Sequence, residues 1–226
     1  MTKKAHGQLR RSQVITTYGP GALIDLPRHS AIVAGLDTWG NTKDLDEIIE
    51  PRLTRKLQGM LDIPNPRLFS PPIASDHWDE KNRGIGAWRF PEWFVVQEPL
   101  EGESRERSRR LIHWKRLDQN GRTFEKHPVV PTRFVRACTR GHVADIRWWD
   151  FVHHGSTECR ADLWLDEKGT SGDLADLTIR CRCGAVRGLY EASVIESLAL
   201  GMCHGDRPWL GRDVSEVCGI PARLLI

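Results

Sequence analysis

The feature that most constrains this sequence is a short pattern around its cysteines, in which a cysteine is followed within three residues by glycine. Glycine adopts positive φ without strain, so backbone N–H groups after the cysteine can turn back toward a metal-bound sulfur. The pattern occurs at residues 138–141, 181–184, 203–205 and 218–219. In an extended strand Cys181 and Cys183 would point to opposite faces, so burial as apolar side chains accounts for only one of them. A turn enforced by a metal ion accounts for both.

We therefore expect one structural Zn2+ in the C-terminal half of the chain, held mainly by thiolates. The sequence leaves open which four of the five best candidates bind it. These candidates are Cys138, Cys181, Cys183, Cys203 and Cys218. Cys159 has no glycine close behind it and is the weakest cysteine candidate, and His142 can substitute for a thiolate.

Composition and the start of the chain indicate what class of protein this is and in which cellular compartment we expect it. Apolar residues make up 39% and charged residues 28% of 226 residues, which allows a packed core and excludes disorder or collagen. No run approaches the ~18 apolar residues that a membrane span needs, and no apolar stretch follows the basic N-terminus. We expect a cytoplasmic protein with no membrane partner, in which paired cysteines among the six are metal ligands rather than disulfides.

Strand and helix signals mix without regular alternation, which predicts an α+β fold with short strands and helices and an irregular, zinc-stapled C-terminal part. In the first part we expect an extended run at 14–18, a hairpin of 22–26 with 31–36, helices on both sides of Pro51 within 42–60, an irregular proline-rich stretch at 62–78 and a strand at 88–96. Later we expect strands at 129–137, 164–165 and 177–180, an aromatic helix at 145–153 and a helix at 190–200.

Three regions follow from these expectations. Residues 1–100 form an N-terminal α+β region with a basic arm, and residues 128–226 form the cysteine-rich zinc-binding region. Between them, residues 101–127 form a basic linker or hairpin. Its segment 103–116 has six basic and two acidic residues and includes a tryptophan. Basic side chains interleaved with an aromatic can neutralise phosphates and stack a base, although a solvated surface has a similar composition. The candidate nucleic-acid contacts are Arg105, Arg107, Arg109, Arg110, Trp114, Lys115 and Arg116.

Catalytic motifs are absent from the sequence. No Gly-Lys-Ser/Thr phosphate loop occurs, and neither H-E-x-x-H nor the zinc-deaminase signature is present. Thiolate-rich zinc sites are usually closed to substrate. We therefore expect no enzyme activity, and the alternative is a zinc-dependent nuclease that uses His153 and His154 with Asp145 and Asp150.

Several longer motifs resemble the DrmB family, a component of the DISARM anti-phage defence system. The resemblance spans nearly the whole chain. Its motifs are RRSQVITTYGPGALIDLP (10–27), VAGLD (33–37), RFPEWF (89–94), RFVRAC (133–138) followed by Gly141 and His142, LWLDE (163–167), GTSGDL (169–174) and RPWLG (207–211).

The resemblance implies a helicase-associated protein with a cysteine-rich zinc-binding region, which works beside a DrmA-like helicase and helps to handle phage DNA. It supplies no catalytic residues. The expected function is thus a non-catalytic accessory subunit of a defence complex, and a purely structural scaffold is a further alternative. Chains of this family are longer and continue past Ile226, so we expect a missing C-terminal half or a second chain to complete the strand at 223–226.

Overall fold

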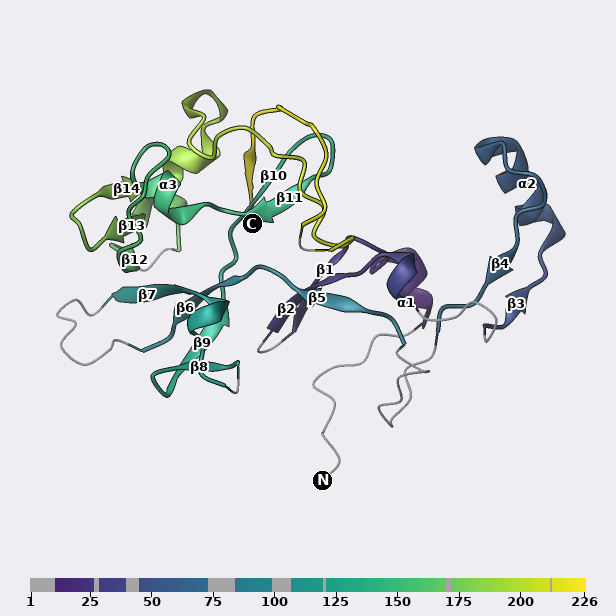
Figure 1. The fold of residues 1–226 in the computed structure, drawn as a ribbon, viewed down its shortest axis with the longest axis horizontal. Helices are drawn as coiled ribbons and strands as arrows, with labels where there is room; N and C mark the ends of the chain where they lie inside the picture. The colour runs from purple at the N-terminus through teal and green to yellow at the C-terminus, as the bar shows by residue number, and fades with distance from the viewer. Residues whose placement is uncertain are drawn as a thin grey trace.

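The computed structural model describes residues 11–26, 29–39, 45–72, 84–98, 107–119, 121–169, 172–211 and 213–226. Short helices and antiparallel sheets are mixed along these residues, which confirms the α+β prediction (Figure 1). Most of the basic arm and Arg105 lie outside the described residues. In the described part of the chain the longest helix has 11 residues, and no helix is long and apolar enough to cross a membrane.

The N-terminal sheet has the strand order β1-β2-β5, formed by Leu23–Leu26, His29–Val33 and Ala87–Arg89. Strands β1 and β2 pair antiparallel from Leu23 with Ile32 onward, so the predicted hairpin is confirmed. The extended run predicted at 14–18 is wrong, because helix α1 occupies Arg11–Thr16. The N–H groups of Thr17 and Tyr18 bond to the Gln13 carbonyl at 2.8 and 2.7 Å. β-branched residues favour an extended chain, but here local helical hydrogen bonds satisfy the backbone.

A second small unit contains β3 (Glu47–Ile48), helix α2 (Pro51–Leu61) and β4 (Leu68–Phe69). Figure 1 shows it at the end of the molecule away from β12 to β14. The helix predicted after Pro51 is present, because proline suits the first helical turn and the Glu50 side chain accepts a hydrogen bond from the Arg52 N–H. Before Pro51, residues 47–48 instead pair with β4, so the helix predicted there is wrong at these residues.

The largest sheet has seven antiparallel strands in the order β14-β13-β12-β7-β6-β9-β8. These strands are β6 Trp93–Val96, β7 Ser108–His113, β8 Thr123–Phe124, β9 His127–Pro131, β12 Leu163–Glu167, β13 Leu177–Cys181 and β14 Val186–Gly188. Strand β7 comes from the basic segment and pairs with both β6 and β12. The basic segment therefore supplies a central strand of the sheet.

The cysteine-rich part is built on a small sheet of order β11-β10-β15, from Val143–Asp145, Val135–Ala137 and Arg223–Leu225. The strand predicted near the end of the sequence is present as β15, and one of its edges pairs with β10 of the same chain. Helix α3 (Trp148–Val152) packs its buried aromatic residues into the main core. That core also contains Ile146, Leu163 and Ile179, each at most 1% exposed.

The α-helix predicted at 190–200 is wrong. The chain there forms two short 3-10 helices, Leu189–Ser193 and Ile195–Ser197, and the second ends at Leu198 in the left-handed region. Serine hydroxyls bond to nearby carbonyls: Ser193 donates to the Tyr190 carbonyl at 2.7 Å, and Ser197 to that of Val194 at 2.6 Å. Such side-chain bonds compete with the α-helical pattern and favour tight turns.

Candidate metal centres

Four side chains form the first Cys/His group, which we call centre 1: Cys138, His142, Cys203 and Cys218. Their donor atoms all lie within 4.8 Å of one another. Cys138 Sγ lies 3.3 Å from His142 Nδ1 and 3.9 Å from Cys218 Sγ. Cys138 and His142 flank the turn between β10 and β11, whereas Cys203 and Cys218 belong to the irregular segment before β15. Centre 1 therefore joins a hairpin to a segment that has little regular structure of its own.

The second group, centre 2, contains His153, Cys159, Cys181 and Cys183, whose donor atoms also lie within 4.8 Å of one another. His153 Nε2 lies 3.2 Å from Cys183 Sγ, and the Sγ atoms of Cys159 and Cys181 are 3.7 Å apart. His153 follows helix α3, and Cys181 ends strand β13. Centre 2 therefore ties the helix to the edge region of the seven-stranded sheet.

The turns around the cysteines have the geometry that their glycines predict. The glycines at 141, 184, 205 and 219 all adopt positive φ, between 70° and 102°. The N–H groups of Arg140 and Gly205 donate to the Sγ atoms of Cys138 and Cys203 at 3.4 and 3.3 Å. In both turns the donor lies two residues after the cysteine, so the backbone dipoles favour a thiolate or a metal-bound sulfur.

In each centre the histidine has one ring nitrogen facing a sulfur atom and the other bonded to an oxygen, although the two histidines use opposite nitrogens. His142 Nε2 bonds to Glu216 Oε1 at 2.7 Å, and His153 Nδ1 bonds to the Trp149 carbonyl at 2.7 Å. A carbonyl oxygen can only accept, so Nδ1 of His153 carries a proton, and Nε2 is the nitrogen that faces the Cys183 sulfur. A histidine that ligates a metal ion usually has such an oxygen partner on its other nitrogen.

The pKa values of the thiols differ within each centre. Burial raises the pKa of Cys203 to about 11 and that of Cys181 to about 11. Burial also acts on Cys138, but backbone hydrogen bonds from His142 and Arg140 outweigh it and lower its pKa to about 7. Backbone and His153 hydrogen bonds lower the pKa of the exposed Cys183 to about 6. Clustered thiolates repel one another, so a cation is needed for all three thiols of a centre to ionise together.

The five cysteines predicted from the sequence do not gather at one point. The structure places Cys138, Cys203 and Cys218 in centre 1 but Cys181 and Cys183 in centre 2. His142, expected as a substitute, completes centre 1. Cys159 and His153, which sequence reasoning set aside, complete centre 2. One signal could have indicated this division, because six cysteines exceed what one four-ligand site can use.

Each centre offers three sulfur donors and one nitrogen donor. Tetrahedral thiolates about 2.3 Å from a metal ion lie about 3.7 Å apart, and the two Sγ–Sγ distances of 3.9 and 3.7 Å fit this value. These residues could therefore hold a metal ion at each centre. Four protein ligands per ion would leave no open coordination position for a substrate.

The residues considered for a nuclease have separate partners. Asp150 pairs with Arg147 at 2.8 Å, and Asp145 accepts the Glu92 N–H at 3.0 Å. His153 belongs to centre 2, and the neighbouring His154 is exposed. In the described residues, these side chains do not meet as a group of metal ligands.

The basic side chains of β7 and of the short 3-10 helix Trp114–Arg116 that follows it make several contacts within the protein. Arg110 and Arg116 both pair with Asp162, and Arg110 also lies over the Trp164 ring at 5.2 Å. Burial raises the pKa of Asp162, but hydrogen bonds from these two arginines outweigh it and lower the pKa below its ordinary value. Half-buried Arg110 therefore helps to hold the sheet together through its contacts with Asp162 and Trp164.

The remaining members of the predicted nucleic-acid set are more varied. Arg107 donates to the Gly169 carbonyl at 2.8 Å, and Arg109 donates to the Ser108 carbonyl at 3.2 Å. Trp114 packs against the cluster around Phe94 and lies under Arg89. Lys115, Arg107 and Arg116 are exposed. Within this set, these three cations are the exposed ones among the described residues.

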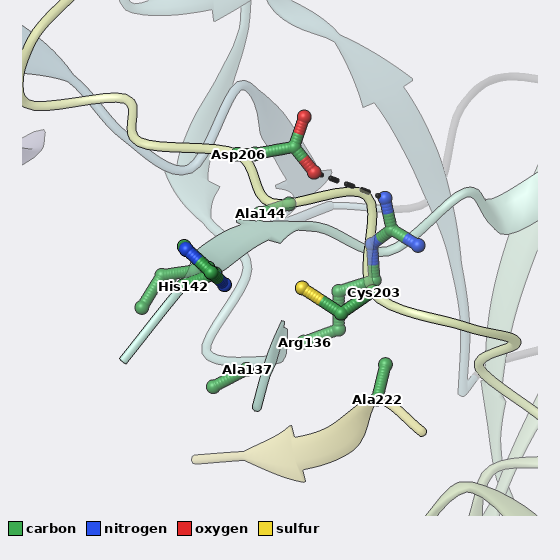
Figure 2. A pocket seen from close by; sticks show the side chains of 8 residues that line it. Arg136, Ala137, His142, Ala144, Cys203, Asp206 and Ala222 are labelled. Atoms are coloured by element: carbon green, nitrogen blue, oxygen red, sulfur yellow. Dashed lines mark hydrogen bonds and ion pairs between the residues drawn. The ribbon is translucent and has the colours of Figure 1, made fainter. Parts of the chain in front are cut away.

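A small pocket borders centre 1 and is shown in Figure 2. Cys203 and His142 lie on its wall, and Arg136 forms an ion pair with Asp206 at 3.4 Å. The Arg136 side chain is only 8% exposed, so a full positive charge is buried beside the sulfur atoms. A centre with three thiolates and a divalent cation carries a net negative charge, which this arginine can stabilise.

The fold and the two centres together define an antiparallel α+β protein whose C-terminal part is organised around paired Cys3His groups. The chain belongs to the DUF8724 family, a domain of unknown function, which matches residues 10–226. None of the curated proteins compared with the chain matches it.

Proposed function

We propose that this chain binds two structural Zn2+ ions and acts as a non-catalytic accessory subunit of an anti-phage defence complex, beside a DrmA-like helicase and in contact with phage DNA. The observation that carries the proposal is the pair of Cys3His groups, each with all donor atoms within 4.8 Å. Sulfur and imidazole donors in a four-ligand set favour zinc over magnesium or calcium, which prefer oxygen.

A structural role for the zinc is supported by where the ligands come from. Each centre links segments that share few regular hydrogen bonds, such as the β10–β11 turn and the segment 203–219. Because ligands must be brought together for the ion to bind, the free energy of metal binding contributes to folding. In this proposal the ions supply cross-links in addition to the main core, and the chain's own residues carry out no bond-breaking chemistry.

The helicase and defence parts of the proposal rest on the DrmB resemblance of the motifs at 10–27, 33–37, 89–94, 133–142, 163–174 and 207–211. These motifs contain strand β1, the start of β6 and the turn that carries Cys138. The DNA part rests on the exposed cations Arg107, Lys115 and Arg116. Each phosphate contact by such a side chain releases counterions, so binding weakens as salt rises.

Metal analysis tests the zinc part. We expect two Zn2+ per purified chain, and one after either Cys203→Ser or Cys183→Ser. Two adjacent histidines provide a matched control, because His153 belongs to centre 2 and His154 does not. His153→Asn should lower the zinc content toward one, and His154→Asn should leave two. A chain that is stable and metal-free, or that holds oxygen-preferring ions instead, would contradict the proposal.

The helicase and DNA parts need a separate measurement. We expect the chain to co-purify with a DrmA-like helicase and to raise its affinity for DNA. Lys115→Gln should reduce the slope of log affinity against log salt by about one, whereas Arg110→Gln should lower thermal stability without a change in that slope. Cleavage of DNA by the isolated chain with Mg2+ or Mn2+, abolished by Asp150→Ala, would refute a non-catalytic role.

A further inference from the structure

A second, larger pocket of about 260 Å³ lies between helix α3 and the segment around residues 197–201. We call it the arginine pocket, because Arg136, Arg147 and Arg187 all line it. Its other polar side chains are Asp150, His154, Ser156, Ser197 and His204. Three arginines and one carboxylate face the pocket, whereas Asp206 and Glu191, which pair with Arg136 and Arg187, lie outside its lining.

Among the described residues, protein acceptors use only some of the N–H donors of these arginines. Arg147 pairs through Nε with Asp150 at 2.8 Å and is 56% exposed. Arg187 donates to Glu191 at 2.9 Å and to the Phe151 carbonyl at 3.0 Å. A guanidinium has five N–H donors, so these bonds account for a minority of the donors of each side chain.

Arg136 is the most distinctive of the three. Its side chain is 8% exposed, and its contacts with Asp206 and the Met202 carbonyl are long, at 3.4 and 3.5 Å. Among the described residues, no hydrogen-bond partner is found for its buried Nε. A buried guanidinium with weak partners is costly, and an anion held in the adjoining pocket would reduce that cost.

We propose that the arginine pocket binds a phosphate group. Arginine forks match the geometry of phosphate oxygens and bind them through paired, charge-assisted hydrogen bonds. The pocket is somewhat smaller than the ~300–1,000 Å³ typical of sites for drug-sized ligands, which suits a phosphate group with little attached to it. The phosphate can belong to a free monoester or to a nucleic-acid backbone. This proposal does not depend on the helicase role.

Calorimetric titration of the full, as-purified chain with inorganic phosphate tests the proposal, with ionic strength held constant by NaCl. We expect saturable binding at one site. Arg147→Gln should weaken it about tenfold or more, because a hydrogen bond between charged groups is lost. Asp150→Asn should strengthen it, because the competing carboxylate is removed. Arg67→Gln is the matched control, since Arg67 is also an exposed, carboxylate-paired arginine but lies directly before β4, away from the pocket lining, and it should bind like the wild type.

Two further ligands distinguish the sources of phosphate. A deoxynucleoside monophosphate presents a monoester, and a short deoxyoligonucleotide without terminal phosphates presents only diesters. Tighter binding of the first assigns the pocket to a free monoester, and tighter binding of the second assigns it to a nucleic-acid backbone. The proposal is overturned if none of the three ligands binds saturably, or if Arg147→Gln binds phosphate as well as the wild type.

Discussion

At the residue scale, each candidate metal centre contains a histidine whose ring is held by a hydrogen bond on the nitrogen that faces away from the sulfur atoms. Glu216 bonds to His142 Nε2 and also pairs with Arg207 at 2.6 Å, so the carboxylate is itself held in place. The Trp149 carbonyl has the same role for His153. Neither oxygen is a candidate ligand, yet both select the nitrogen that faces the sulfur atoms.

Glu216→Ala is therefore expected to weaken zinc binding at centre 1 by about 10- to 100-fold, because His142 loses the partner that orients its ring. Competition with a chromogenic chelator measures this affinity. Glu47→Ala is the control, because Glu47 also pairs with an exposed arginine but lies in β3. Equal zinc affinity in the two variants would show that Glu216 does not position the histidine.

Gly205 and Gly219 provide a second residue-scale comparison, because both have positive φ, at 79° and 70°. A Cβ on Gly205 would lie 1.7 Å from the Glu216 carbonyl oxygen, whereas a Cβ on Gly219 would meet nothing within 4 Å. Gly219→Ala should cost about 1–2 kcal/mol from backbone strain and keep both zinc ions. Gly205→Ala should also disrupt centre 1 and lower the zinc content, as elemental analysis can show. Two zinc ions in stable Gly205→Ala would contradict this account.

At the element scale, Asp145 connects strand β11 to the start of β6 by accepting the Glu92 N–H. Burial raises the pKa of Asp145 to about 7, and the neighbouring Glu92 charge adds to this effect. A raised pKa means that the folded state favours the protonated acid. The stability from this group is complete below the unfolded pKa of ~3.9 and is lost as the pH rises toward 7.

The melting temperature of Asp145→Asn should thus rise relative to that of the wild type as the pH increases from 5 to 8, because Asp145 ionises over this range and asparagine stays neutral. Asp118→Asn is the control, because hydrogen bonds from Thr123 and from the Lys126 N–H hold the pKa of Asp118 below its ordinary value. That group stays ionised throughout the range, so its variant should differ from the wild type by a constant amount. A difference for Asp145→Asn that does not change with pH would contradict the shift.

Competing local hydrogen bonds also explain why two predicted elements, at 14–18 and at 190–200, were wrong. Residues 14–18 carry β-branched side chains, but the described residues pair β1 with β2 and leave 14–16 in helix α1. At 190–200 the helical pattern of apolar residues is interrupted by serines whose hydroxyls bond to carbonyls. Propensity is a weak guide where a short segment has competing local hydrogen bonds.

At the scale of the whole molecule, the two centres differ in their access to solvent. Three ligands of centre 1 are buried, with His142 only 2% exposed, whereas Cys183 of centre 2 is exposed. A chelator should therefore remove zinc from centre 2 first. We expect biphasic zinc release in EDTA, with the fast phase absent in Cys183→Ser and retained in Cys203→Ser. Loss of the fast phase in Cys203→Ser instead would reverse the assignment.

The sequence by itself was sufficient for local features. Glycines after cysteines predicted turns with positive φ, which all four such turns have, and apolar runs predicted the hairpin β1–β2 and the strands β12 and β13. Each of these features depends on residues that are close together along the chain, so propensity and turn geometry are enough to indicate it.

Only the tertiary structure decided which cysteines share a centre. Cys138 and Cys218 are 80 residues apart, and His153 and Cys183 are 30 apart, so no local spacing relates them. Their proximity depends on the pairing of β10 with β15 and on the packing of α3 against β13. The placement of Arg110 was decided in the same way, because β7 pairs with β12 and thereby brings this arginine near Asp162. Long-range strand pairing and core packing, which no short segment encodes, thus decided how the cysteines divide between the two centres and which arginines pair within the protein.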